Sequence, residues 1–437
     1  MVRFVFRFAA RPLIAVALFA VSSCAAPSAM HGPTTNAASS HRARLLPAIQ
    51  HVVILEMENR SFDNYFATFP GANGIPMDPN GVPLVTCNPD PRSGLCVLPF
   101  HDTQTVNYGG PHSTTATATD LDGGMLDGFV VSAETRSNGR DPSPDEVMGY
   151  HTQAEIPYYW RLATRYTLAD NFFAATSSYS TVAHLYAVSG WSARCKTLDP
   201  MSCKSNNNVG ISGPPTYAWT DLTWILHQHG VSWNYFVFDG GSPHQITDDD
   251  EYVSPFSYYD QLSLWNPMPA FEDVAEDGEE GNIAPGTTFI ADATAGALPA
   301  VSWVIPPFTK SDHPPSDISI GQQFVQRLVS AVQHGPEWQS TVIFIQWDEW
   351  GGFYDHVVPP VIDGLGYGFR VPMIIVSPLA KQGYIDHQLL SSDAELKFIE
   401  DLFCGSQRLD STDGRPDPRP DVREAQPSLG DLSLDFN

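Results

Sequence analysis

Positive charge is scarce in this chain of 437 residues, which carries 23 lysines and arginines against 49 aspartates and glutamates. Charged residues of both signs make up only 16% of the sequence, and the formal net charge is −26. A protein that binds a polyanion normally shows the opposite balance, with basic side chains gathered on one face. We therefore expect no nucleic-acid partner, and the length favours one large globular unit or two domains.

The N-terminus lacks an apolar run of membrane-spanning length, since Leu13–Val21 is too short to cross a bilayer as a mature helix. Three arginines precede this run, so residues 1–23 are predicted to be an export signal. The next residues complete Val21-Ser22-Ser23-Cys24, which resembles the lipobox of bacterial lipoproteins, with Cys24 as the lipidated residue. Cleavage near Ala25-Ala26 would instead release a soluble secreted protein. We expect an exported protein, either a periplasmic or outer-membrane lipoprotein or a secreted one.

Cysteine is sparse as well, at six residues, and no pair is spaced like a zinc knuckle with partner histidines. Export permits disulfides. The simplest pairing joins close neighbours, Cys87 with Cys96 and Cys195 with Cys203, although sequence alone does not fix the connectivity. Cys404 ends a predicted helix and is expected to be a buried free thiol.

The rest of the chain alternates strands with helices. Residues 24–47 are rich in Ala, Ser, Thr and Pro and are predicted to be a flexible tether. The predicted strands are 51–55, 231–238, 300–305, 341–346 and 371–376, and the predicted helices are 154–166, 220–229, 320–334 and 392–403. Between the first strand and about residue 150 we expect a long irregular region. The alternation predicts an α/β fold with a mostly parallel central sheet sandwiched between helices. We assign 48–409 to this domain and 410–437 to an extended C-terminal tail.

Two of the predicted strands end abruptly in polar residues. The run from His51 to Leu55 breaks into Glu56, Glu58, Asn59, Arg60 and Asp63, and the strand at 341–346 runs through Trp347 into Asp348 and Glu349. Packing in a hydrophobic core does not explain why a strand should end in several polar and ionisable residues. Ligands of open α/β sheets, however, bind at the carboxyl ends of strands. If the two strands are neighbours, three carboxylates converge and would repel unless a cation neutralised them or their pKa values rose. An all-oxygen ligand set suits Mg²⁺, Ca²⁺ or Mn²⁺ better than Zn²⁺.

Three further stretches carry polar groups of ambiguous meaning. Hydroxyls cluster over 177–181, at the start of a predicted helix, where they would cap the helix or face an anion. His313, in Asp312-His313-Pro314-Pro315, would by itself be read as a surface-loop residue. His112, which follows Gly109-Gly110-Pro111, is equally ambiguous.

Together these motifs resemble one family. MENRSFDNYF at 57–66, a serine followed by HLY at 184–186, SDHPP at 311–315 and WDEWGGFYDHV at 347–357 occur in the order found in the bacterial phosphoesterases that include acid phosphatases and phosphatidylcholine-type phospholipases C. The resemblance spans roughly residues 48–405. It implies a fold like that of alkaline phosphatase and the sulfatases.

The resemblance also implies roles for individual residues. The divalent metal would be bound by Glu58, Asn59, Ser180, Asp348 and Glu349. Ser180 would be the nucleophile, with Thr181 as the alternative because the usual Pro-Asn pair before the histidine is replaced by Val-Ala. His112 and His313 would contact the phosphoryl oxygens or serve the leaving group. Arg60 and His244 are the other candidates for substrate binding.

The expected function is therefore an exported, metal-dependent phosphoesterase that works through a phosphoserine and resembles acid phosphatases. Its partner would be a small phosphate ester or a phospholipid headgroup, and its oligomeric state stays open. A phospholipase C is the alternative, although the longer phospholipases carry C-terminal domains beyond the point where this chain ends. A non-catalytic lipid-anchored binding protein is the alternative of another class. The Cys/Ser-x-Pro-x-Arg signature of a sulfatase is absent.

Overall fold

A buried apolar run forms the centre of the main sheet in the computed structural model of this chain. β1 (His51–Met57) is buried from its second residue onward. It pairs in parallel with β11 (Val301–Ile305) on one side and with β12 (Thr341–Trp347) on the other. Strands covered on both faces are apolar throughout instead of alternating with polar residues. This explains why the sequence predicted these three strands correctly.

The structure describes residues 48–437 apart from 138–142, 210–215, 239–263 and 413. These residues belong to one compact unit, Arg42–Asn437. The predicted export signal and tether, together with Cys24 and His244, lie outside the described residues.

The main sheet has eight strands in the order β10-β9-β11-β1-β12-β13-β6-β14. Besides the three central strands, these are β6 (Thr167–Ala169), β9 (Trp233–Val237), β10 (Ile283–Pro285), β13 (Met373–Val376) and β14 (Tyr384–Asp386). Every neighbouring pair is parallel except those that β13 makes with β12 and β6. The predicted fold class, α/β with a mostly parallel central sheet, is confirmed.

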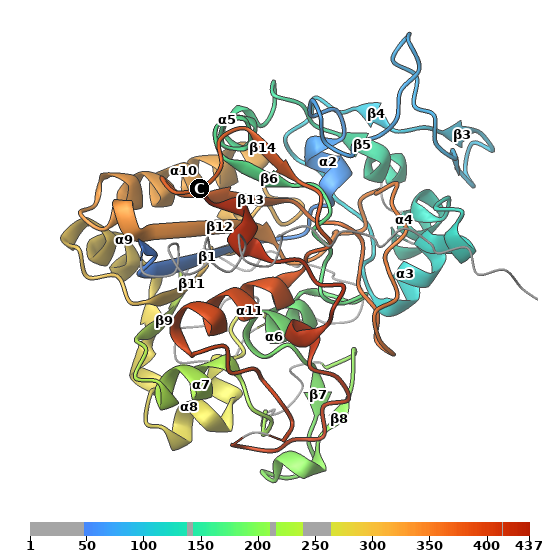
Figure 1. The fold of residues 1–437 in the computed structure, drawn as a ribbon. Coiled ribbons are helices and arrows are strands. Elements are labelled where there is room, and N and C mark those ends of the chain that lie inside the picture. Colours follow the sequence, from blue (N-terminus) through green and yellow to red (C-terminus); the bar gives the residue numbers. More distant parts are fainter. Residues whose placement is uncertain (1–47, 138–142, 210–215, 239–263, 413) are drawn as a thin grey trace, which may run out of the picture. The chain divides into compact units, whose positions relative to one another are not determined.

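Helices cover both faces of this sheet, with α9 and α10 on one side and α6 and α11 on the other (Figure 1). The described α-helices are α2 (Phe62–Phe66), α3 (Thr114–Leu121), α4 (Phe129–Ser137), α5 (Pro157–Arg165), α6 (Ser180–Ser189), α7 (Leu222–Gln228), α8 (Glu272–Glu276), α9 (Gly286–Ala295), α10 (Ile318–His334) and α11 (Ser392–Phe403). None of the helices in the described ranges has the length and apolar character needed to cross a membrane. The expectation of an irregular region up to about residue 150 was wrong in part, because α3 and α4 lie within it.

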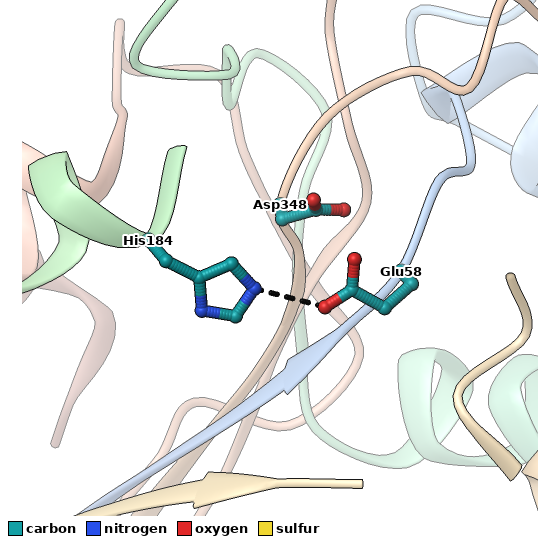
Figure 2. A group of neighbouring side chains, drawn as sticks. All are labelled: Glu58, His184 and Asp348. Carbon is teal, nitrogen blue, oxygen red and sulfur yellow. Dashed lines mark hydrogen bonds and ion pairs between the residues drawn. The ribbon is translucent and has the colours of Figure 1, made fainter. Parts of the chain in front are cut away.

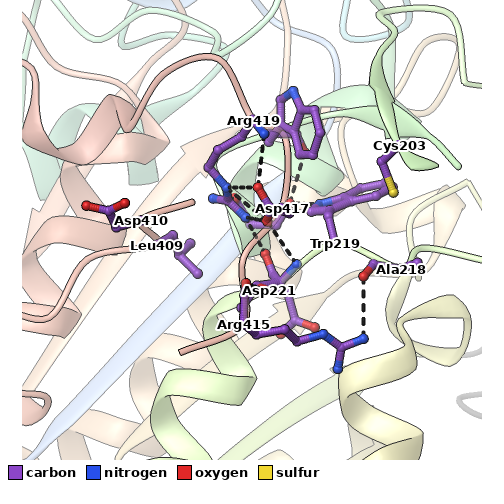
Figure 3. Close-up of polar contacts among 12 residues, drawn as sticks. Cys203, Ala218, Trp219, Asp221, Leu409, Asp410, Arg415, Asp417 and Arg419 are labelled. Atoms are coloured by element: carbon purple, nitrogen blue, oxygen red, sulfur yellow. Dashed lines mark hydrogen bonds and ion pairs between the residues drawn. The ribbon is translucent and has the colours of Figure 1, made fainter. Parts of the chain in front are cut away.

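The C-terminal segment is packed against the domain, which corrects its prediction as an extended tail beginning at residue 410. It contains only short 3₁₀ turns among its described residues, yet Leu432 and Phe436 are each 1% exposed. Arg419, which forms an ion pair with Asp417 (Figure 3), donates to the carbonyl oxygens of Ser189 and Thr220 at 3.0 and 2.6 Å. Buried carbonyls need such donors. The packed domain therefore continues past residue 409.

Within the described residues, two disulfides join the two pairs of neighbouring cysteines as predicted. Cys87–Cys96 lies at the ribbon of β2 (Asn88–Pro89) and β3 (Cys96–Val97), and Cys195–Cys203 lies at that of β7 (Ala193–Arg194) and β8 (Lys204–Ser205). β4 (Phe100–His101) and β5 (Gly149–Tyr150) form a third short ribbon. Cys404 is a buried free thiol, and burial raises its pKa to about 12.

Candidate functional site

Three parallel strands deliver polar residues to one edge of the sheet. The register of β1 and β12 pairs Met57 with Trp347, so the next residues of each strand are also adjacent. Asp348 donates its N–H to Met57 O at 3.0 Å, and Glu58 donates its N–H to the carbonyl of Ser311, beyond the end of β11, at 2.8 Å. The predicted convergence of the strand ends is therefore present, and the SDHPP segment joins it.

Each of three buried carboxylates at this edge has one oxygen held by a neighbour. Asp348 Oδ1 accepts the Asn59 N–H at 2.9 Å, and Glu349 Oε2 accepts the Gly351 N–H at 2.7 Å. Glu58 Oε1 lies 2.9 Å from His184 Nε2 (Figure 2). The opposite oxygens of Glu58 and Asp348, Oε2 and Oδ2, are buried and receive no hydrogen bond from any residue that the structure describes.

The electrostatics of this arrangement is unfavourable without a counter-charge. Burial raises the pKa of Glu58 well above its ordinary value, and repulsion by Asp348 raises it further. Burial also raises the pKa of Asp348, although its hydrogen-bond contacts with Glu58, the Asn59 N–H and the Ser180 hydroxyl act in the opposite direction. A divalent cation would reverse both shifts by favouring the charged carboxylates.

The donor atoms fit a cation. One ligand atom each from Glu58, His184 and Asp348 lie within 4.8 Å of one another, and all three residues are buried. Open carboxylate oxygens are ligands for hard divalent ions, whereas an imidazole nitrogen also suits softer ones. The chain thus contains a candidate metal-binding group at the strand ends.

Ser180 lies beside this group as the first residue of α6. Its Oγ donates to Asn59 Oδ1 at 3.5 Å, a long contact, and its side chain is 3% exposed. Asn59 has a φ of 57°, in the left-handed region that asparagine tolerates better than most residues. Thr181 Oγ1 is buried with no hydrogen-bond partner within the described ranges.

The two predicted histidines lie at the same edge in different surroundings. His112 Nε2 is 3.4 Å from Asn59 Nδ2 and 3.7 Å from Glu349 Oε1, so this ring faces the strand ends. The His313 ring packs against Phe308, with ring centroids 4.9 Å apart, and its Nδ1 donates to Pro314 O at 2.6 Å.

The guanidinium group of Arg60 donates hydrogen bonds to other groups of the protein. Its Nε and Nη2 donate to the carbonyl of Asp312 at 3.0 and 2.9 Å, and its Nη1 donates to Asn107 Oδ1 at 3.0 Å. The guanidinium also lies over the Phe353 ring, 4.6 Å from its centroid. These contacts fasten the SDHPP segment to the loop that follows β1, and the substrate contact of Arg60 stays a prediction.

The sequence profile of the phosphoesterase family matches residues 49–404. The chain belongs to this family. Among its curated relatives are the non-hemolytic phospholipase C of Burkholderia pseudomallei, 27% identical over 84% of this chain and 56% of that protein, and phospholipase C A of Mycobacterium tuberculosis, 27% identical over 82% of this chain and 73% of that protein. This chain thus spans little more than half the length of the first of them. The match to a solved sulfatase from Pseudoalteromonas sp. covers 93% of this chain and 78% of the sulfatase chain, with 9% identity and a TM-score of 0.40. Family membership therefore rests on the sequence match.

Sequence reasoning overlooked one residue of this phosphoesterase, His184. It is fully buried, with Nε2 at Glu58 and Nδ1 3.4 Å from Glu56 Oε2. Burial lowers the pKa of His184 to about 3 and raises that of Glu56 well above its usual range, which favours the neutral form of each. The available signal was spacing, because His184 follows Ser180 by four residues and therefore shares its face of α6.

The first glycine of the pair at 351–352 allows the backbone there to lie close to Asn59. Gly351 has a φ of 61°, and a Cβ there would come within 2.5 Å of Asn59 O. Gly351→Ala would therefore displace Asn59, and the left-handed backbone adds about 1–2 kcal/mol of strain. We expect a lower melting temperature because of this strain, and hydrolysis reduced by about tenfold or more because Asn59 would be misplaced beside Ser180.

The matched control is Gly364→Ala, where a Cβ meets nothing within 4 Å. Calorimetry and initial-rate measurements should give this variant the same melting temperature and the same rate of hydrolysis as the parent. Equal behaviour of the two variants would contradict the claim that Gly351 is needed for the position of Asn59.

Proposed function

We propose that this phosphoesterase hydrolyses phosphate esters through a covalent phosphoserine on Ser180, with one divalent cation held by Glu58, Asn59, Asp348 and Glu349. The observation that carries the proposal is the pair of buried carboxylate oxygens, Glu58 Oε2 and Asp348 Oδ2, which accept no hydrogen bond from the part of the chain that the structure describes. Groups of this kind are costly in a folded protein unless a ligand completes them.

The chain's own residues divide the chemistry between them. A bound divalent cation would lower the cost of forming an alkoxide and would balance charge on the phosphoryl oxygens. Ser180 Oγ attacks phosphorus, so that an O–P bond forms at Ser180 while the bond to the leaving alcohol breaks, and the proton lost by the serine hydroxyl is balanced by the proton that the leaving oxygen gains. Asn59 and Asp348 orient the hydroxyl by the contacts described above. Water then attacks the phosphoserine and releases phosphate or a phosphorylated headgroup.

His112 and His313 are proposed to contact the phosphoryl oxygens or to protonate the leaving oxygen. His112 is supported by its position between Asn59 and Glu349. Arg60 is proposed to position the SDHPP segment, and through it His313, because its donors are used on Asp312 and Asn107.

The ester class has two candidates, an acid-phosphatase-like monoester activity and cleavage of phospholipid diesters. The names of the relatives favour the second. Export, with a lipid anchor at Cys24, belongs to the same proposal and rests on the sequence of the first 24 residues. A non-catalytic binding protein of the same fold is the alternative that an activity assay decides.

The deciding assay compares p-nitrophenyl phosphate with p-nitrophenyl phosphorylcholine before and after removal of metal. We expect hydrolysis of at least one substrate, a fall of about 100-fold or more after chelation, and recovery with Mg²⁺, Ca²⁺ or Mn²⁺. Full activity in protein shown by elemental analysis to be free of metal would contradict the cation. Absence of hydrolysis by metal-loaded protein would favour the non-catalytic alternative.

A further inference from the structure

Two residues at the start of α6, one turn apart, face the end of β1. Ser180 and His184 are separated by four residues and so lie on one face of the helix. Glu56 lies on β1 and Glu58 is the first residue after it, two positions further on, and alternate residues of an extended chain point to the same side. The pairs meet, because His184 Nε2 lies 2.9 Å from Glu58 Oε1 and its Nδ1 lies 3.4 Å from Glu56 Oε2.

The two oxygens of Glu58 therefore have different surroundings. Oε1 faces His184, whereas Oε2 has no donor among the described residues. Asp348 shows the same division, since Oδ1 accepts the Asn59 N–H and Oδ2 accepts no hydrogen bond within the described ranges. A carboxylate with one oxygen held and the other open is typical of a metal ligand oriented by an outer partner.

We propose that His184 is a positioning residue, which holds Glu58 Oε1 so that Oε2 points at the cation site and which ties that ligand to the helix carrying Ser180. This inference rests on the proposed function for the presence of the ion. The hydrogen bond between His184 and Glu58 couples the position of the metal ligand to the position of the nucleophile. A shift of α6 would move both Ser180 and Glu58.

His184 is assigned this role instead of direct ligation because both of its ring nitrogens face other groups. Nε2 faces Glu58, and Nδ1 faces Glu56 and the Tyr235 oxygen, 3.5 Å away, whose hydroxyl donates to Trp265 O at 2.7 Å. The side chain is fully buried. The nitrogen nearest to the open oxygens, Nε2, is therefore directed at Glu58 Oε1 instead of at an ion.

The test compares His184→Gln, whose amide can still donate to Glu58, with His184→Leu, which has similar volume and no donor. Titration calorimetry with Mn²⁺ should show affinity lowered by about 10–100-fold in the Leu variant and largely kept in the Gln variant. At saturating Mn²⁺ the Leu variant should show a lower kcat with an unchanged KM, because His184 does not touch the substrate. Equal Mn²⁺ affinity of Leu variant and unaltered protein would overturn the proposal, as would a directly bonded nitrogen coupling in pulsed EPR of the Mn²⁺ complex.

Crystal structures of the two variants without metal give a readout that does not depend on the ion. The Glu58 carboxylate should keep its orientation in His184→Gln and rotate in His184→Leu, and an unmoved Glu58 in the Leu variant would overturn the inference. If the unaltered protein binds no Mn²⁺, the proposed function loses its support while this comparison still decides the role of His184. Should the Leu variant fail to fold, His184→Phe supplies a flat ring without a donor, with the same expected outcomes.

Discussion

Ser180→Ala is expected to lower kcat/KM by about 10³-fold or more, because loss of the nucleophile leaves only binding and electrostatics to accelerate the reaction. Cation binding should weaken far less, since the carboxylates of Glu58 and Asp348 are untouched. Steady-state rates with both p-nitrophenyl esters and calorimetric titration with a divalent ion measure the two effects separately. Acid quenching after incubation with ³²P-labelled substrate should label the unaltered protein and not the variant.

Thr181→Ala is the matched control, because Thr181 is the neighbouring hydroxyl and its Oγ1 has no hydrogen-bond partner in the described part of the chain. Its removal should leave the rate nearly unchanged. The reverse pattern, with Thr181→Ala inactive and Ser180→Ala active, would move the nucleophile to Thr181. Full activity of both variants would remove the covalent mechanism altogether.

The sequence was sufficient to predict the strand ends that build the site. β1, β11 and β12 are apolar runs followed at once by polar residues, and parallel neighbours must bring those residues to one edge. The inference that Glu58, Asn59 and Asp348 lie together needed only this geometry. Their roles toward a metal and a substrate still await the experiments above.

The contacts of His184 and Arg60 could not be predicted in the same way. The face of α6 that meets β1 is set by packing, so the spacing of Ser180 and His184 acquires meaning only once the helix is placed. Arg60 has a long side chain that turns back to the carbonyl of Asp312, which residue type and position do not reveal. Sequence reasoning identifies which residues are polar, whereas packing determines what each one contacts.

The helices α3 and α4 were not predicted from the sequence, and the reason lies in their composition. α3 consists largely of threonine and alanine and α4 contains two adjacent valines, and β-branched residues are weak helix formers. Tertiary packing holds α4, since Phe129 and Val130 are fully buried. The C-terminal segment was misjudged for a related reason, because its arginines suggested solvent although Arg419 is buried among carbonyl groups.

Asp348→Asn is expected to change stability and metal binding in opposite directions. The amide oxygen can still accept the Asn59 N–H, which leaves the NH₂ group at the position of Oδ2, facing Glu58. There it replaces a repulsion by a hydrogen bond, so the metal-free variant should be more stable than the metal-free parent by about 1–3 kcal/mol. The same NH₂ group cannot ligate a cation, so affinity for the ion should fall by about 100-fold or more, and hydrolysis with it.

Glu395→Gln is the matched control for loss of a buried carboxyl group. Glu395 is fully buried on α11, and burial followed by repulsion from Glu56 raises its pKa well above the ordinary value, which keeps the group neutral. A neutral carboxyl is closely matched by an amide, so this variant should bind the ion as the parent does. Thermal unfolding should then show that the divalent ion raises the melting temperature of the parent and of Glu395→Gln but not that of Asp348→Asn. A metal-free Asp348→Asn less stable than the parent, or one still stabilised by the ion, would show that the open oxygen of Asp348 is not part of the site.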